Sequence, residues 1–192
     1  MSEAKKESMG MLALMLFLIT FITALLLGFV NQVTAPQIAK NNEATRAAAM
    51  AEIIPDAEFV EAEPSEVPAP DKETPAIQNI YEAQKDGETV GYCMEVLPSG
   101  FGGTLTVVVG INTDGTVAGA KVTSHAETPG LGAKAQSDPT WIVQFAGQAA
   151  DGSLAVTKDG GSVVPITGST ITSRAVTLAV NTAASYVQSL AA

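Results

Sequence analysis

Hydroxyl side chains gather in the stretch TGSTITSR, residues 167–174, directly before the last helical pattern of the chain. The backbone N–H groups at a helix start are unpaired and carry a partial positive charge, which suits a phosphate group. A plain helix cap needs one hydroxyl, whereas this stretch has five. Arg174 is expected in the first turn, where the helix dipole disfavours a cation unless an anion is close. Helical periodicity alone favours an ordinary capped helix, whereas the surplus hydroxyls and Arg174 indicate an anion site.

Two further stretches contain more glycine than a simple strand connection needs. They read SGFGG at 99–103 and HAETPGLGAK at 125–134. Glycine permits positive φ angles and close backbone approach, so both loops could lie against a flat ligand or form plain turns. His125 is expected to form hydrogen bonds within its loop, or else to contact a ligand. With Glu127 it could also act as an acid–base pair, but without a Ser or Cys nucleophile motif hydrolysis is disfavoured.

Charge and composition restrict the class of protein further. Ten basic residues stand against twenty acidic ones in a chain of 192, for a net charge of −10. Nucleic-acid binding depends on Lys and Arg, so a nucleic-acid partner is not expected. With Cys93 and His125 as single residues of their types, neither an internal disulfide nor a Cys/His metal site is expected.

The elements that must position these loops begin with an apolar segment at residues 9–30, which holds no charged residue. It is long enough to cross the hydrocarbon core as a helix. A cleavable signal peptide is the alternative, with VTA at 33–35 resembling a cleavage site, but the apolar run is longer than a signal core. Lys5 and Lys6 precede the helix closely, which favours a cytoplasmic N-terminus slightly.

Residues 31–75 are predicted to connect this anchor to a folded domain. Helical spacing predicts a stalk helix over 36–55. The segment 52–73 carries eight acidic residues and four prolines, so it is expected to be a solvated, partly extended connector. The folded domain is then expected over 76–192. Residues 1–8 are expected to form an N-terminal tail before the membrane segment.

Within the domain, alternating apolar residues predict paired strands. Two runs between 77 and 98 flank Asp86-Gly87, and the runs 104–111 and 116–123 flank Asp114-Gly115, which predicts two tight hairpins in an antiparallel sheet. Trp141, Ile142 and Phe145 have the spacing of a short helix, and 173–190 that of a longer one. Helices on one face of such a sheet give an α+β fold.

Taken together, the anchor, GFGGTL at 100–105, HAETPGLG at 125–132 and TGSTITSRAV at 167–176 resemble the G subunit of the Rnf electron-transport complex. The same FMN-binding domain occurs in the related C subunit of sodium-pumping NADH:quinone reductase. The resemblance implies a membrane anchor, an FMN-binding domain outside the cytoplasm, and flavin esterified through its phosphate to the last Thr of an S/T-G-A-T motif. TGST matches that motif at Thr167, Gly168 and Thr170, so Thr170 is the implied acceptor.

The match departs from the family pattern at two positions. Ser169 stands where Ala is usual, and Val164 stands where the recognition pattern of the attaching flavin transferase has Asp. The implied phosphate site includes Ser169, Thr172, Ser173 and Arg174. The implied isoalloxazine site comprises Gly102, Gly103, His125, Glu127, Thr128, Gly130 and Leu131.

The expected function is that of an electron-transfer subunit with covalent FMN in a complex that couples ferredoxin and NAD to ion transport. No activity is expected of the chain alone. Expected partners are the other membrane and redox subunits, the flavin transferase during maturation, and membrane lipid. The alternatives are a C-type subunit of the quinone reductase and a flavin-free anchored scaffold.

Overall fold

The described part of the chain begins with one long helix. The computed structural model describes residues 9–62 and 74–190 and contains α1 from Met9 to Ile53, with Pro36 inside it. The predicted membrane segment and the predicted stalk helix are thus parts of one continuous helix. A proline removes one backbone N–H from a helix, and the flanking hydrogen bonds carry the helix past it. The chain divides into two compact units, residues 1–44 and 45–192, which are considered separately.

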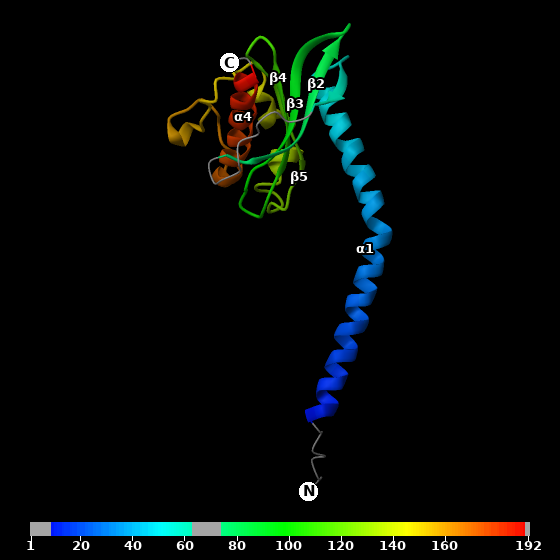
Figure 1. The fold of residues 1–192 in the computed structure, drawn as a ribbon. Coiled ribbons are helices and arrows are strands. Elements are labelled where there is room, and N and C mark those ends of the chain that lie inside the picture. The colour runs from blue at the N-terminus through cyan, green and yellow to red at the C-terminus, as the bar shows by residue number, and fades with distance from the viewer. Residues whose placement is uncertain (1–8, 63–73, 191–192) are drawn as a thin grey trace. The chain divides into compact units, whose positions relative to one another are not determined.

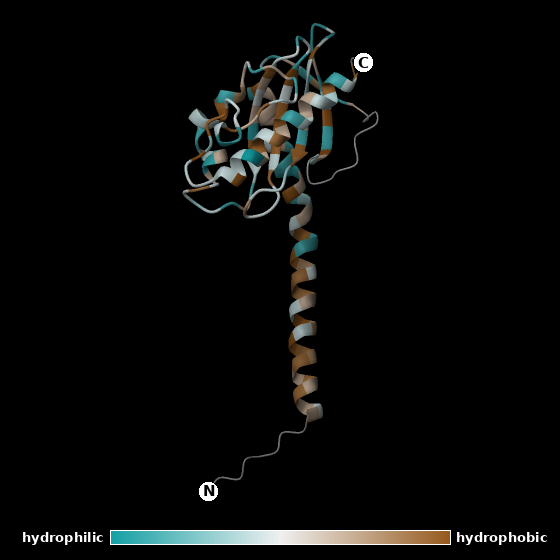
Figure 2. Cartoon of the chain, turned by 90° about the vertical axis from the view of Figure 1, so that its left-hand side faces the viewer, coloured by the Kyte–Doolittle hydropathy of each residue, from teal (hydrophilic) through white to brown (hydrophobic). Residues whose placement is uncertain are grey.

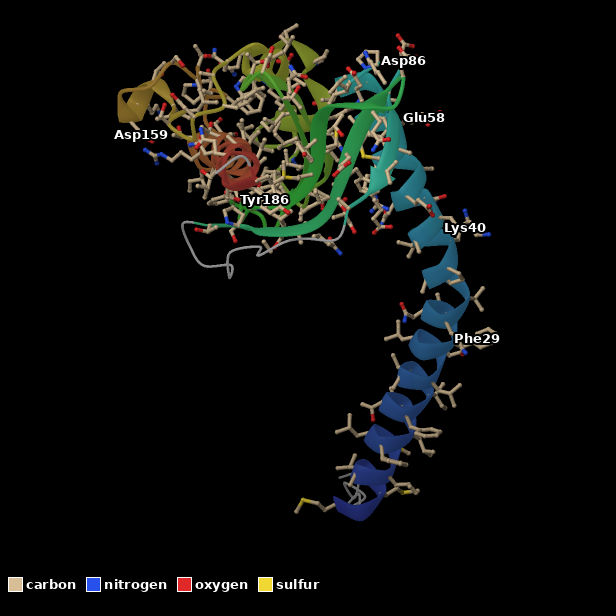
Figure 3. The ribbon with its side chains drawn as sticks, turned by 45° about the horizontal axis from the view of Figure 1, so that its top comes forward. Phe29, Lys40, Glu58, Asp86, Asp159 and Tyr186 are labelled. Carbon is tan, nitrogen blue, oxygen red and sulfur yellow. The ribbon has the colours of Figure 1, made fainter. Side chains whose placement is uncertain are left out.

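The first unit is an apolar helical segment. Its large hydrophobic side chains, such as Phe29 at 63% exposure, project away from the helix axis (Figure 3). Figure 2 shows the hydrophobic colouring that runs along this part of α1. The helix is long and apolar enough to cross a membrane.

The second unit is built on a five-stranded antiparallel sheet. The strands are β1 (Glu58–Glu61), β2 (Ala76–Lys85), β3 (Glu88–Leu97), β4 (Thr106–Asn112) and β5 (Val117–Ser124), and they lie side by side in chain order (Figure 1). The α+β fold predicted from the sequence is thereby confirmed.

Both predicted hairpins form at their Asp-Gly pairs. Asp86 and Gly87, at the tip of the β2–β3 hairpin (Figure 3), have φ angles of 52° and 83°. A two-residue turn needs positive φ at both positions to follow the strand twist, and Asp-Gly tolerates this. At the β4–β5 turn Gly115 has a φ of 83°.

One face of the sheet is covered by α4, from Thr170 to Leu190 (Figure 1). The apolar side of α4 packs on β3, β4 and β5 and forms the main core, with Val176 and Val180 fully buried. The short segments α2 (Lys134–Ser137), α3 (Pro139–Ile142) and η1 (Val143–Phe145) pack on β5, and the short turn η2 (Thr157–Asp159) precedes α4. The predicted short helix around Trp141 is thus α3 continued by a 3₁₀ turn, and the predicted long helix starts at Thr170 rather than residue 173.

The other face of the sheet is covered by the last turns of α1. Ala49, Met50 and Ile54 pack on a second apolar cluster that includes Cys93 and Val108. This contact is the reason that the compact unit begins at Thr45, ahead of the expected boundary at residue 76.

The acidic segment 52–73 also contains structure that its composition did not predict. Strand β1 pairs with β2 along its whole length, from Glu58 opposite Gln84 to Glu61 opposite Tyr81. Backbone hydrogen bonds to a neighbouring edge do not require apolar side chains, so this strand forms despite its charge. The prolines 64, 68 and 70 lie outside the described residues.

Candidate functional site

The loop before α4 is held by the hydroxyl of Ser173. Its Oγ accepts a hydrogen bond from the Ile166 N–H at 2.9 Å and donates one to the Ser169 carbonyl at 2.9 Å. Gly168 lies between them with a φ of 80°, a conformation that glycine adopts without a steric penalty. Ser173 is fully buried, so it shapes the loop. Its expected role as a ligand contact stays a prediction.

The two glycine-rich loops meet α4 at the carboxylate of Glu127. Its Oε1 accepts hydrogen bonds from the N–H groups of Phe101 at 2.8 Å and Gly102 at 3.1 Å. Its Oε2 accepts one from the Thr172 hydroxyl at 2.9 Å. Glu127 is 6% exposed and Thr172 is 1% exposed, so these bonds lie in a shielded environment where charge-assisted hydrogen bonds are strong.

Gly132 is a glycine because atoms of other residues in this arrangement lie too close to it for a side chain. A Cβ atom added to Gly132 would clash with the Glu127 carboxylate and would lie 2.8 Å from the Thr172 hydroxyl oxygen. His125 lies at the start of the same loop, where its Nδ1 accepts a hydrogen bond from the Glu127 N–H at 3.1 Å. This contact is the loop hydrogen bond expected for His125.

The first residue of α4, Thr170, has a cation beside its hydroxyl. The Lys158 ammonium donates a hydrogen bond to Thr170 Oγ1 at 2.9 Å. Lys158 comes from η2, the 3₁₀ turn that lies next to the start of α4. A hydroxyl, an ammonium and the unpaired N–H groups of a helix start therefore lie together, and all of them favour an anionic ligand.

The guanidinium of Arg174 is occupied by a carboxylate of the chain. It forms a two-bond salt bridge with Asp159, with Nε to Oδ2 at 2.7 Å and an Nη to Oδ1 at 2.6 Å. The bridge lowers the pKa of Asp159 and raises that of Arg174. Asp159 lies on the turn that projects away from the sheet (Figure 3). The positive charge of Arg174, which was predicted to need an anionic ligand, is thus balanced by Asp159.

A cavity of about 430 Å³ opens between these elements, within the range typical of small-molecule sites. Seven of the residues predicted from the sequence line it, namely Glu127, Thr128, Leu131, Gly168, Ser169, Thr170 and Thr172. The other predicted residues do not line it, namely Thr167, Ser173, Arg174, Gly102, Gly103, His125 and Gly130.

Four residues of this cavity were missed in the sequence, namely Phe101, Gly132, Lys158 and Ile171. Lys158 lies twelve residues before Thr170, and one lysine in a turn gives no signal of its target. Phe101 lines the cavity and is 70% exposed. Its position inside GFGG could have marked it, since a large apolar side chain in a glycine loop has no fold-level reason to be there.

Val164, where the transferase pattern has Asp, presents its side chain outward at 62% exposure. Its carbonyl accepts hydrogen bonds from the Trp141 indole at 2.7 Å and the Gln144 amide at 3.3 Å. Its N–H donates to Gln144 Oε1 at 2.8 Å. The backbone at this position is therefore fixed whichever side chain it carries.

The lining of the cavity combines polar and apolar side chains. Thr170 and Lys158 provide the polar end, while Phe101, Leu131 and Ile171 provide large, partly exposed apolar side chains. These features define an α+β domain with a small-molecule cavity at the start of α4, in a chain that also has a helix long and apolar enough to cross a membrane.

Comparisons with known proteins agree with that class. The family model described as FMN-binding domain matches residues 100–185, and the RnfG N-terminal region matches residues 1–53. The G subunit of the Na(+)-translocating ferredoxin:NAD(+) oxidoreductase complex of Acetobacterium woodii is 39% identical over 93% of this chain and 91% of its own. The chain belongs to the family of G subunits of ion-translocating oxidoreductase complexes.

Two further relatives cover less of the chain. The G subunit of the ion-translocating oxidoreductase complex of Escherichia coli K12 is 45% identical over 59% of this chain and 58% of its own. The crystal structure of the C subunit of the Na(+)-translocating NADH-quinone reductase of Parabacteroides distasonis is 32% identical, covers 59% of this chain and 63% of its own, and has a TM-score of 0.49.

Proposed function

We propose that this chain is a membrane-anchored electron-transfer subunit that carries FMN in an ion-translocating ferredoxin:NAD oxidoreductase complex. The observation that carries the proposal is the cavity beside Thr170, in a chain related over 93% of its length to the G subunit of such a complex. FMN supplies the redox chemistry when bound. The remaining membrane and redox subunits of the complex are its partners.

The residues of the chain divide the binding task between them. Thr170, Lys158 and the start of α4 hold the phosphate, because they supply a hydroxyl, an ammonium and free backbone N–H groups. Phe101 and Leu131 cover the ring with apolar surface. Glu127 holds the two glycine loops against α4 and thereby fixes the shape of the cavity.

We further propose that the FMN phosphate is esterified to Thr170. The bond from Thr170 Oγ to phosphorus forms while a phosphoanhydride bond of a flavin dinucleotide donor breaks. The hydroxyl proton leaves, and the nucleoside monophosphate departs. A flavin transferase catalyses this step. The linkage explains how an open site keeps its cofactor without enclosing it.

Peptide mass spectrometry tests the linkage. Holoprotein from cells that make the transferase should give a peptide around Thr170 heavier by one FMN phosphoryl unit, and a fluorescent band on a denaturing gel. Thr170→Val should remove both signals, whereas Thr113→Val, at an exposed position in the β4–β5 turn, should keep them. An unmodified peptide from the assembled native complex would overturn the covalent proposal, and a complex with no flavin on this subunit would overturn the function.

Orientation is also a proposal. The two lysines at positions 5 and 6 support a cytoplasmic N-terminus and a domain outside the cytoplasm, with α1 in contact with membrane lipid. Cys93 is fully buried and does not serve as a labelling site. An impermeant thiol reagent on intact cells should label Glu88→Cys, at the exposed start of β3, in a Cys93→Ala background. Labelling of Ser2→Cys instead would reverse the orientation.

A further inference from the structure

The turn that carries Lys158 is fixed to the core on both sides. Val156 and Val163, which flank it, are each 1% exposed. The Thr157 N–H donates to the Val163 carbonyl at 2.8 Å, and the Val163 N–H donates to the Ala155 carbonyl at 3.0 Å. The base of the Lys158 side chain is therefore held in place, although the side chain itself is exposed.

Two successive side chains of this turn reach α4 one helical turn apart. Lys158 contacts the hydroxyl of Thr170, and Asp159 binds the guanidinium of Arg174. The salt bridge uses both oxygens of Asp159, so the carboxylate is directed away from Thr170 and toward Arg174. The turn thus separates its two charged side chains. Lys158 lines the cavity, and Asp159 binds Arg174.

Lys158 is the cationic side chain among the residues that line the cavity. The cavity also contains the carboxylate of Glu127, but both of its oxygens are occupied by hydrogen bonds from Phe101, Gly102 and Thr172. At Thr170 itself, an anion meets the ammonium of Lys158 and the positive end of α4.

We propose that Lys158 positions the Thr170 hydroxyl for flavin attachment and balances the charge of the phosphodiester that results, an inference that rests on the proposed function. Before the transfer, the ammonium donates to a lone pair of Thr170 Oγ1 and orients the hydroxyl. After the transfer, the phosphodiester carries one negative charge, which the single charge of Lys158 matches. From the sequence, the helix start and Arg174 were expected to stabilise the charge of the phosphate.

A rate measurement on full-length protein in detergent, with purified transferase and flavin dinucleotide, tests the inference by intact mass. Lys158→Met should attach flavin at least about tenfold more slowly than the wild type, because a hydrogen bond from a charged group to the reacting oxygen is lost. Lys158→Arg should recover most of the rate. Lys134→Met, which removes a lysine of α2 that does not line the cavity, is the matched control and should behave as wild type.

A second readout separates charge from folding. Free FMN should bind Thr170→Val protein with an affinity that falls as NaCl is raised, because salt screens the ammonium. Adding Lys158→Met should weaken binding and flatten this salt dependence, and thermal melting of each variant checks the fold. If Lys158→Met lowers the melting temperature, Lys158→Gln is measured in the same two assays. Its attachment rate and its salt dependence then test whether Lys158 acts through its charge.

The outcomes distinguish this inference from the proposed function. A wild-type protein that stays unmodified and dark overturns the covalent proposal itself. The other outcome is a wild-type protein that is modified at Thr170. If Lys158→Met and Lys158→Gln are then modified at the same rate as the wild type, and bind FMN with the same salt dependence, the role of Lys158 is overturned while the attachment proposal stands.

Discussion

The Thr172 hydroxyl donates a hydrogen bond at 2.9 Å to Glu127 Oε2, across 45 residues of sequence. This bond ties the second glycine-rich loop to the first turn of α4. The other carboxylate oxygen, Oε1, accepts hydrogen bonds from the N–H groups of Phe101 and Gly102. The buried side chain of Glu127 therefore sets the distance between the glycine-rich loops and the start of α4. The shape of the cavity between them depends on this side chain.

Replacing Glu127 with Ala should lower the free energy of unfolding by about 2 kcal/mol or more, because three hydrogen bonds to a shielded carboxylate are lost. Glu127→Gln should lose less, since an amide oxygen can still accept from the two N–H groups. Urea unfolding followed by the fluorescence of the single tryptophan, Trp141, measures the change. Glu88→Ala, at an exposed position, should unfold as wild type. Equal stability of the Ala variant and wild type would contradict the role of this carboxylate.

The Gly110 position in β4 should not tolerate a larger side chain. A Cβ atom there would clash with the side chain of Ile53, at the end of α1, whereas one at the paired Gly119 would make an ordinary contact at 3.5 Å. Gly110→Ala should cost about 2 kcal/mol of stability, as overpacking does, and Gly119→Ala should be close to neutral. Ile53→Ala should restore part of the loss in the Gly110→Ala background. Equal losses at the two glycines in chemical unfolding would contradict the packing of the helix end on the sheet.

A partly buried ion pair should stabilise the same contact between the end of α1 and the sheet. The Arg46 guanidinium lies 3.2 Å from Glu95 Oε2 and 5.4 Å from the centre of the Tyr81 ring, and Asn79 donates to the same Glu95 oxygen. Arg46→Met should destabilise the domain by about 3 kcal/mol, because Glu95 is left as an uncompensated buried charge. Adding Glu95→Gln should recover most of that loss, since the charge is removed while an acceptor for Asn79 remains. A double variant no more stable than Arg46→Met would exclude this explanation.

Local sequence signals predicted the domain elements well. The Asp86-Gly87 pair marks a turn through its own backbone preference, and the apolar spacing after residue 173 marks α4 through its buried side. The hydroxyl-rich loop was recognised because five hydroxyls exceed the needs of a cap. In each of these cases the cause lies within a few residues of the structure that it produces.

Relationships across the chain could not be predicted in the same way. Strand β1 depends on an edge offered by β2, and the end of α1 depends on glycines in distant strands. Glu127 and Lys158 gain their importance from partners 45 and 12 residues away. Arg174 was assigned to an anionic ligand because helix electrostatics demanded an anion, and the sequence did not reveal that Asp159 supplies one.

The thiol of Cys93 should make the domain sensitive to alkali. Burial raises its pKa to about 12 from an ordinary value near 9.0. Below the lower value the thiol is neutral in both folded and unfolded chains. Above it the unfolded chain ionises first, so stability is lost as the pH rises, with a slope of up to about 1.4 kcal/mol per pH unit until the folded thiol also ionises.

The prediction concerns the difference between the wild type and Cys93→Ala, in which contributions other than that of the thiol cancel. The variant should be less stable near neutral pH because it leaves a cavity against Val108 and Ala83. Its stability should then fall less steeply as the pH rises above about 9, since it has no thiol to ionise. Urea unfolding of both proteins in full-length form across this range measures the two slopes. Parallel curves would show that Cys93 reaches solvent in the folded protein, and the packing of α1 over β3 would have to be revised.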